Sequence, residues 1–345
     1  MEIKKIGEYA LLSGLFVGNH LLAILRAANP LAKAAKREEV DETASTLVTS
    51  RGIAKSCDVF PNLIISDEKS FNPEWYQDIK DGDKVYVISK SLGGFVKAIL
   101  PKLKEEKISI TLVTGASVRG VPREISEQHQ IDYLELIEKS DVITHWFTQN
   151  YDLDYVHEKI TPIPLGLDYH TLYRKPFWWG TKAYPIDQEK QLLRIASRAK
   201  PFWDRLDKSY SFFHFNVFER HGGDRYEAMK WLEGKNFNVF AWGRMSRKRT
   251  WQICSKYKYI ISPHGNGLDC HRTYEAIALG CIPVVRTSSL DLIYRDLPVI
   301  ILQNWEECTI ERLNEEAKKL KLEKIEKIRL GYWVNLIGSK SLVVS

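Results

Sequence analysis

The stretch SPHGNGLDCHRTYEAIALGCIPVV, from Ser262 to Val285, decides the fold of this chain. It continues the apolar run YKYIIS (257–262), which predicts a buried strand. The loop PHGNG follows, and Asp269 to Leu279 has the apolar spacing of a helix that ends at Gly280. The run CIPVV then predicts a second buried strand. The stretch therefore predicts a strand, a glycine loop, a helix and another strand, which is the βαβ pattern of a parallel sheet.

The glycine loop predicts an anion site. Gly265 and Gly267 are expected to adopt positive φ and to let the backbone approach a ligand closely. A helix that opens after such a loop presents unpaired N–H groups and the positive end of its dipole, which suits a phosphate or pyrophosphate. Arg272, in the first turn, could clamp phosphate oxygens, and Glu275 could accept the two hydroxyls of a ribose. The plainer alternative is that Asp269 only caps the helix and that Arg272 pairs with Glu275.

The same alternation extends through the rest of the chain and predicts an α/β protein. A Pro- and Gly-rich run at 161–180 separates two halves. In the first half, helical patterns lie at 95–106, interrupted at Pro101, and at 127–139. The tail at 309–330 predicts a long charged helix. The predicted strands are 85–89, 108–114 and 141–145 in the first half, and 211–218, 238–241, 257–262, 281–285 and 297–302 in the second.

Composition limits the function. The 345 residues suit two domains, and 44% hydrophobic residues allow a substantial core. A net charge of +6 is mild, so a dedicated nucleic-acid binder is not indicated and an anionic small molecule fits better. The five cysteines form no CxxC pair, which argues against zinc knuckles and a disulfide framework. With no Asn-x-Ser/Thr sequon, we expect a cytoplasmic protein.

The N-terminal apolar stretch YALLSGLFVGNHLLAIL (9–25) leaves membrane contact open. It is shorter than the roughly 20 residues that span a bilayer, and Asn19 and His20 interrupt it. No small-residue cleavage site indicates a signal peptide. We expect a packed or membrane-surface helix, with a true anchor of the Golgi lumenal type as the alternative.

The opening stretch closely resembles the C-terminal block of exostosin-like glycosyltransferases, family 47. That block reads Ser-Pro-x-Gly, an Arg, aromatic-Glu-Ala and Gly-Cys-Ile-Pro-Val. The likeness continues through LDLIYRDLPVIIL and NWEE, and HWFTQN (145–150) and ITPIPLGLDYHTL (160–172) also resemble pieces of this group. It covers roughly two-thirds of the chain, from about Ser109 onward.

The resemblance implies a GT-B architecture, two Rossmann-like parallel-sheet domains facing across a cleft. We expect a lead-in at 1–55, an acceptor domain at 56–165, a nucleotide-sugar domain at 166–320, and a helix and tail at 321–345. The family implies an inverting transfer from a nucleotide-diphosphate sugar to a glycan acceptor, without a bound metal. Gly265, Asn266 and Gly267 match the donor loop, Arg272 the phosphate-side arginine and Glu275 the sugar-nucleotide glutamate. The expected donor-binding set also includes His264, Asp269, Arg220 and Arg244, with Arg225 as a further arginine for the leaving group.

The general base is harder to assign. The resemblance predicts an acidic residue in the loop after the second strand, but TGASVRGVPRE contains no Asp. Glu124 and Glu127 are the nearest carboxylates, and His145 and His129 are the other candidates.

Two other functions stay open: a nucleotide-sugar-binding protein without turnover, and a metal-dependent hydrolase built on His264, Asp269 and His271. Five tryptophans could stack on sugar faces or pack in the core: Trp178, Trp179, Trp203, Trp242 and Trp251.

Overall fold

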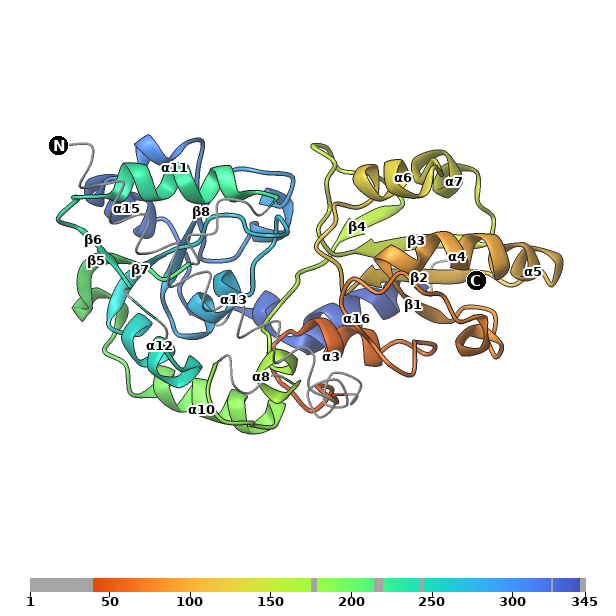
Figure 1. The fold of residues 1–345 in the computed structure, drawn as a ribbon, viewed down its shortest axis with the longest axis horizontal. Coiled ribbons are helices and arrows are strands. Elements are labelled where there is room, and N and C mark those ends of the chain that lie inside the picture. Colours follow the sequence, from red (N-terminus) through yellow and green to blue (C-terminus); the bar gives the residue numbers. More distant parts are fainter. Residues whose placement is uncertain are drawn as a thin grey trace. The chain divides into compact units, whose positions relative to one another are not determined.

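The computed structural model describes residues 40–174, 179–213, 220–241, 243, 245–323 and 325–341. The apolar stretch at 9–25, together with Trp178, Trp242 and Arg244, lies outside these described residues. Residues from Val40 onward form one compact unit that contains two parallel sheets (Figure 1).

The first sheet has four parallel strands whose spatial order follows the chain, β1-β2-β3-β4. Its strands are β1 (Lys84–Ile88), β2 (Ile110–Gly115), β3 (Ile143–Thr148) and β4 (Ile160–Pro162). The connecting helices are α4 (Leu92–Ala98), α5 (Leu100–Glu105), α6 (Arg123–His129) and α7 (Tyr133–Lys139). Because the strand order never reverses, right-handed crossovers place these four helices on one face.

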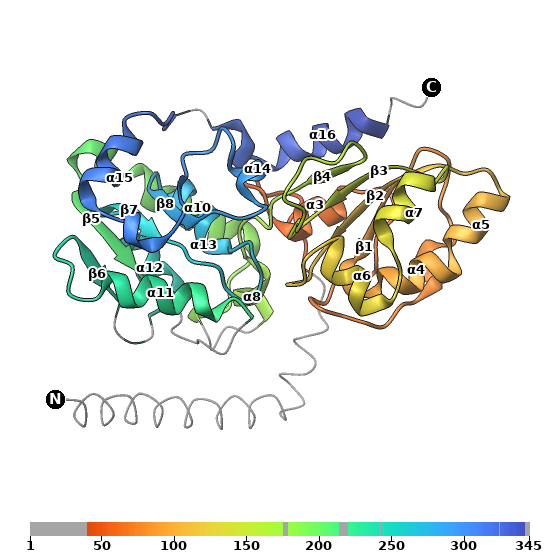
Figure 2. The same ribbon diagram turned by 90° about the horizontal axis from the view of Figure 1, so that it is seen from above.

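The other face of the first sheet is covered by elements from both ends of the described chain. Helix α3 (Ser50–Lys55) contacts β2, and α16 (Leu330–Ser341) contacts β1, β2, β3 and α3 (Figure 2). Ile53 in α3 and Trp333 in α16 are buried in the core that these elements share. The chain therefore returns to its first sheet after completing its second.

The second sheet has the parallel order β6-β5-β7-β8-β9, in which the winding direction reverses between β5 and β7. Its strands are β5 (Leu206–Ser211), β6 (Asn238–Phe240), β7 (Tyr257–Ile261), β8 (Ile282–Arg286) and β9 (Ile300–Leu302). This is a doubly wound order, and its reversal creates a topological switch point.

Helices cover both faces of the second sheet. Along β7, Tyr259 and Ile261 join one apolar cluster and Ile260 joins the other, as the alternation of a strand requires. Helices α11 (Gly222–Leu232) and α15 (Ile310–Ala317) pack on the first cluster, and α12 (Arg247–Cys254) and α13 (His271–Ala278) on the second. The remaining elements are α8 (His170–Arg174), α10 (Pro185–Ser197), α14 (Asp291–Tyr294) and the short 3-10 helices at 73–76, 89–91, 202–204, 305–307 and 326–328.

The fold class expected from the sequence, α/β with two parallel sheets as in the GT-B class, is confirmed. Several element bounds were wrong. β5 ends at Ser211, the first residue of the strand expected at 211–218, and residues 214–218 of that prediction lie outside the described part of the chain. The strand expected at 141–145 begins at Ile143 and extends to Thr148. The helix expected at 127–139 is two helices, because Gln130 takes a left-handed φ of 55° between them. The long tail helix is also wrong: α15 ends at Ala317, and α16 begins only at Leu330.

The domain boundaries stay predictions. The first sheet ends with β4 at Pro162 and the second begins with β5 at Leu206.

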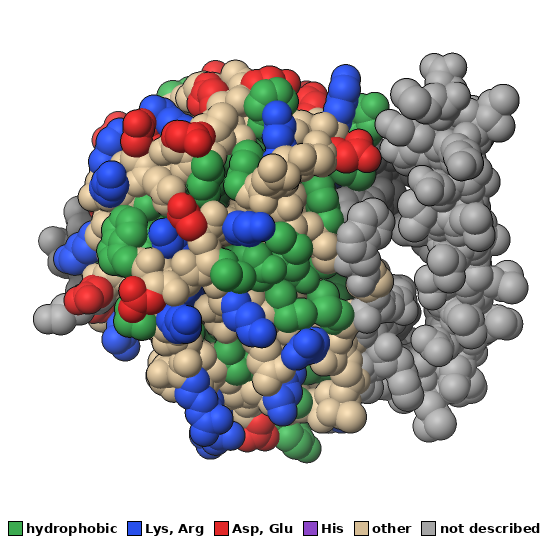
Figure 3. Space-filling model, turned by 90° about the vertical axis from the view of Figure 1, so that its left-hand side faces the viewer, with side chains coloured by type: hydrophobic (Ala, Val, Ile, Leu, Met, Phe, Trp, Pro, Cys, Tyr) green, Lys and Arg blue, Asp and Glu red, His purple; other side chains and the backbone are tan. Residues whose placement is uncertain are grey.

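In the described part of the chain, no helix is long and apolar enough to cross a membrane. Figure 3 shows one face on which apolar side chains gather among lysines and arginines.

Candidate donor-binding site

The switch point of the second sheet is the expected ligand position. Ligands of open parallel sheets bind beyond the carboxyl ends of the strands, where the strand order reverses. Phe212 and Phe213 follow β5, and the segment 262–268 follows β7. Helices α11 and α13, which come after these two strands, cover opposite faces of the sheet. The glycine loop identified from the sequence therefore lies at the switch point.

Arg272 reaches this position from the first turn of α13. Its Nε donates to Ser262 Oγ at 3.2 Å and its Nη2 donates to the carbonyl of Pro263 at 2.6 Å. The guanidinium carbon lies 5.6 Å from the ring centre of Phe213 and 5.9 Å from that of Phe212. Burial lowers the pKa of the guanidinium from its ordinary value. The hydrogen-bond partners of this charge among the described residues are all neutral, so the ion pair with Glu275, the plainer alternative from the sequence, is not formed.

The two loop glycines do not have the positive φ expected from the sequence; each allows other groups of the protein to approach the backbone closely. A Cβ on Gly265 would lie 2.4 Å from Nη2 of Arg225. A Cβ on Gly267 would lie 2.9 Å from Oδ1 of Asn150 and 3.3 Å from the carbonyl oxygen of Val118. Gly267 therefore lets the donor loop lie against loops that follow strands of the first sheet.

His264 and Asn266 hold the loop through their backbones. The N–H of His264 donates to Oδ2 of Asp224 at 2.8 Å, and its carbonyl accepts from Nε of Arg225 at 3.1 Å. The carbonyl of Asn266 accepts from Nη1 of Arg220 at 3.2 Å, whereas the side chain of Asn266 is exposed. Two of the arginines expected near the leaving group are thus bonded to the donor loop, and Arg244 lies outside the described residues.

Asp269 is a buried anchor that precedes α13, so it lies outside the helix in which it was expected. Its carboxylate accepts from the N–H of Leu165 at 2.7 Å, from the N–H of Cys270 at 2.8 Å, and from the hydroxyls of Tyr274 and Tyr294 at 2.7 and 3.4 Å. Burial nevertheless raises its pKa to about 6. Because groups of the protein itself supply all these donors, the carboxylate of Asp269 holds the loop in position.

Glu275, expected from the sequence to bind the ribose of the donor, is buried. Its Oε1 lies 4.0 Å from Nε of Arg247. The Nη2 and Nη1 atoms of the same arginine donate to Oδ2 of Asp168 at 2.9 Å and to Oε1 of Gln188 at 3.1 Å. Burial raises the pKa of Glu275, and the charge of Arg247 opposes this shift. Arg272 and Glu275 therefore engage separate partners, and the ribose-binding role of Glu275 stays a prediction.

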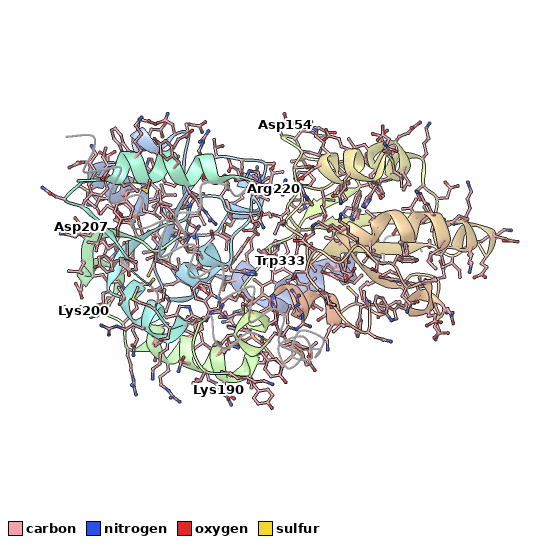
Figure 4. All side chains as sticks on the ribbon, in the orientation of Figure 1. Asp154, Lys190, Lys200, Asp207, Arg220 and Trp333 are labelled. Atoms are coloured by element: carbon pink, nitrogen blue, oxygen red, sulfur yellow. The ribbon has the colours of Figure 1, made fainter. Side chains whose placement is uncertain are left out.

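Of the proposed bases, Glu124 is the one whose contacts reach the donor loop. It accepts from Nη1 of Arg119 and from the N–H of Gly120, both at 2.7 Å, and it pairs with Arg220, the arginine labelled in Figure 4. Burial acts to raise its pKa, but the bonds from Arg119 and Gly120 and the charge of Arg220 lower it overall. Arg220 also donates to the carbonyls of Val118 and Asn266.

The other base candidates have different surroundings. Glu127 is exposed on α6. His145 lies in the middle of β3 with its Nε2 2.8 Å from Thr161 Oγ1, and His129 lies 2.7 Å from the hydroxyl of Tyr133. The structure brings none of these three to the carboxyl edge of the second sheet through a hydrogen bond that it shows.

The three residues of the metal hypothesis bind separate partners. Nδ1 of His264 lies 2.8 Å from the carbonyl of Leu268, and Nδ1 of His271 lies 2.6 Å from the carbonyl of Gly166. Asp269 accepts the four bonds given above. Within the described ranges, no group of three or more His, Cys, Asp or Glu side chains could hold a metal ion.

The described tryptophans have three different environments. Trp251 is a core residue with 1% of its surface exposed, Trp203 is 51% exposed with Lys258 Nζ 5.5 Å from its ring centre, and Trp179 lies 6.0 Å from the guanidinium of Arg247. A sugar-stacking role is thus wrong for Trp251.

Sequence reasoning missed Asp224, the residue that fixes His264. Besides the N–H of His264, its carboxylate accepts from Nε1 of Trp305 at 2.7 Å and lies 3.4 Å from Nη1 of Arg286. The signal was present: Gly222 and Gly223 precede Asp224 and open a helix after β5, the first strand of a doubly wound sheet.

Neither a protein-family model nor a curated protein matches the sequence. Among solved structures, the chain is similar to an alpha1,3-fucosyltransferase with 11% identity and a TM-score of 0.35, over 80% of this chain and 93% of that one. A structure of alpha1,3-fucosyltransferase with GDP-fucose matches with 11% identity and a TM-score of 0.36, over 85% of this chain and 96% of the other.

Proposed function

We propose that this chain is an inverting glycosyltransferase that moves a sugar from a nucleotide-diphosphate sugar to a hydroxyl of a glycan or polysaccharide acceptor. The observation that carries the proposal is Arg272, a guanidinium at the switch point whose hydrogen-bond partners are neutral. A desolvated charge without a counterion is costly, and a bound diphosphate would supply the missing anion. The resemblance of the surrounding stretch to exostosin-like glycosyltransferases supports the same donor class.

In this proposal the residues around the donor loop divide the work. Arg272 binds the diphosphate, and the first N–H groups of α13 add the partial positive charge of a helix terminus. Asp269 and Asp224 fix the loop, and Arg220 adds charge close to Asn266. These groups favour the departure of the diphosphate because its negative charge grows as the bond to the sugar breaks. No residue in this scheme needs a metal ion.

Glu124 is the base that we propose, because it is the candidate carboxylate whose contacts reach Arg220 and the donor loop. Its low pKa and its three donors make it a weak base as it stands, so Arg220 must leave it before it can take a proton.

We propose membrane-surface contact through residues 9–25, which lie outside the described part of the chain.

A nucleotide-sugar-binding protein without turnover is the second candidate, and the engaged state of Glu124 favours it. Two measurements separate the candidates. Thermal stabilisation by a panel of UDP- and GDP-sugars tests donor binding, because a ligand that binds only the native state raises the melting temperature. Release of nucleoside diphosphate in the presence of a glycan mixture tests turnover. Binding with release supports the transferase, binding without release supports the second candidate, and no binding refutes both.

A further inference from the structure

His221 lies at the switch point and has no role in the scheme above. It is the residue before α11, and its backbone N–H donates to the carbonyl of Gly265 at 3.2 Å, so the donor loop holds it in place. Its ring centre lies 6.1 Å from that of His264. Within the described part of the chain neither nitrogen of the His221 ring has a hydrogen-bond partner, whereas the ring of His264 bonds to Leu268. His221 therefore offers an uncommitted imidazole beside the loop.

The charges that face this imidazole come from three segments. His264 belongs to the donor loop, Arg220 and Asp224 flank His221 in the chain, and Glu124 belongs to α6 of the first sheet. Burial, followed by the effects of His264 and Arg220, lowers the pKa of His221 to about 4, although Glu124 and Asp224 oppose the shift. The imidazole is therefore neutral at neutral pH when no anion is bound.

A bound diphosphate would favour the charged form of His221. Negative charge placed beside an imidazole favours the imidazolium, which donates a hydrogen bond from each ring nitrogen. The phosphates would also compete with Glu124 for Arg220, because phosphate oxygens and carboxylates bind the same guanidinium face.

We propose that His221 is a further donor-binding residue, which takes up a proton as the diphosphate enters and then hydrogen-bonds it as an imidazolium. The inference rests on the proposed function, since it needs a diphosphate at the switch point. The proton comes from water and stays on the imidazole while the sugar–oxygen bond breaks and its electron pair moves to the phosphate oxygen. The proton of the acceptor hydroxyl goes to the general base. When the nucleoside diphosphate leaves, the imidazolium returns its proton to water.

The test is the proton uptake that accompanies binding of UDP and of GDP, measured by titration calorimetry from pH 5.5 to 7.5 in buffers of different ionisation enthalpy. The free nucleotide also titrates near pH ~6, so the informative quantity is the difference between wild type and His221→Asn. At pH ~6 we expect wild type to take up about half a proton more than His221→Asn when nucleotide binds. The nucleotide affinity of wild type should therefore rise roughly threefold more than that of His221→Asn for each unit fall in pH. His157→Asn is the matched control, because His157 lies before β4 of the first sheet and contacts Glu138 and Lys159.

Each outcome decides the inference. Extra uptake in wild type and in His157→Asn, but not in His221→Asn, supports it. Equal uptake in all three proteins overturns it and leaves the proposed function intact, since the nucleotide still binds. If wild type binds neither UDP nor GDP, the proposed function fails and the role of His221 fails with it.

Discussion

Replacing Arg272 with Met separates its functional from its structural contribution. In the unliganded protein the guanidinium forms bonds of 3.2 and 2.6 Å to two neutral oxygens, and these bonds offset only part of its desolvation. Methionine has similar length and can pack on Phe212 and Phe213. We therefore expect the free energy of unfolding of Arg272→Met to stay within about 1 kcal/mol of wild type.

Nucleotide binding should respond differently. Loss of one charge-assisted bond to a phosphate costs about 1.5–3 kcal/mol, which weakens affinity roughly 10- to 150-fold. The assay is calorimetric titration with UDP and GDP, next to urea denaturation of the same samples. Arg205→Met is the matched control. Arg205 is also half-buried and donates to Lys200 and Cys281. It lies just before β5, at the amino ends of the strands of the same sheet.

Two results would refute a diphosphate-binding role for Arg272. If Arg272→Met binds nucleotide as tightly as wild type, the guanidinium does not hold the diphosphate. If Arg272→Met loses several kcal/mol of stability while Arg205→Met does not, then the bonds to Ser262 and Pro263 are the reason for the arginine.

Three further predictions test other parts of the structure. The stability of Glu275→Gln relative to wild type, measured in urea melts, should rise between pH 4.5 and 8. Burial raises the pKa of Glu275, so the stability that its carboxyl group contributes below the unfolded pKa is lost as the pH rises through the folded pKa. A stability difference that stays constant with pH would contradict this. Gly267→Ala should lose about 1–3 kcal/mol of stability, since its Cβ would press on Asn150 at 2.9 Å, and an unchanged melt would show that the loop moves freely. Trp333→Ala should cost about 3–5 kcal/mol in the same melts if α16 belongs to the core of the first sheet; a loss below ~1 kcal/mol would show otherwise.

Local pattern was enough to predict the sheets, because buried parallel strands are short apolar runs separated by helical periods. The run YKYIIS became β7 almost residue for residue, and Gly280 ends its helix with a φ of 71°, as a C′ glycine does. The helix expected to be interrupted at Pro101 is divided at Ile99, and Pro101 lies in the first turn of α5. β5 was misplaced because its sequence LDKSYS is exposed over its first three residues and lacks an apolar run.

Tertiary contacts explain what the sequence did not reveal. Nothing local shows that α16 returns to the first sheet, since its partners are more than 180 residues away in the chain. The only partner that the sequence suggested for Glu275 was Arg272 on the same helix, but the buried Arg247 that lies beside its carboxylate comes from another helix. Gly265 and Gly267 were expected to adopt positive φ, but they instead leave room for the side chains of Arg225 and Asn150. Those side chains lie elsewhere in the sequence, so the local pattern did not reveal the contacts.

The most direct test of the central claim is an experimental structure of the chain with bound UDP or GDP. We predict that the diphosphate lies beyond the carboxyl ends of β5 and β7, with a phosphate oxygen within hydrogen-bond distance of the guanidinium of Arg272. A diphosphate bound elsewhere on the chain, or at the switch point without contact to Arg272, would contradict the account.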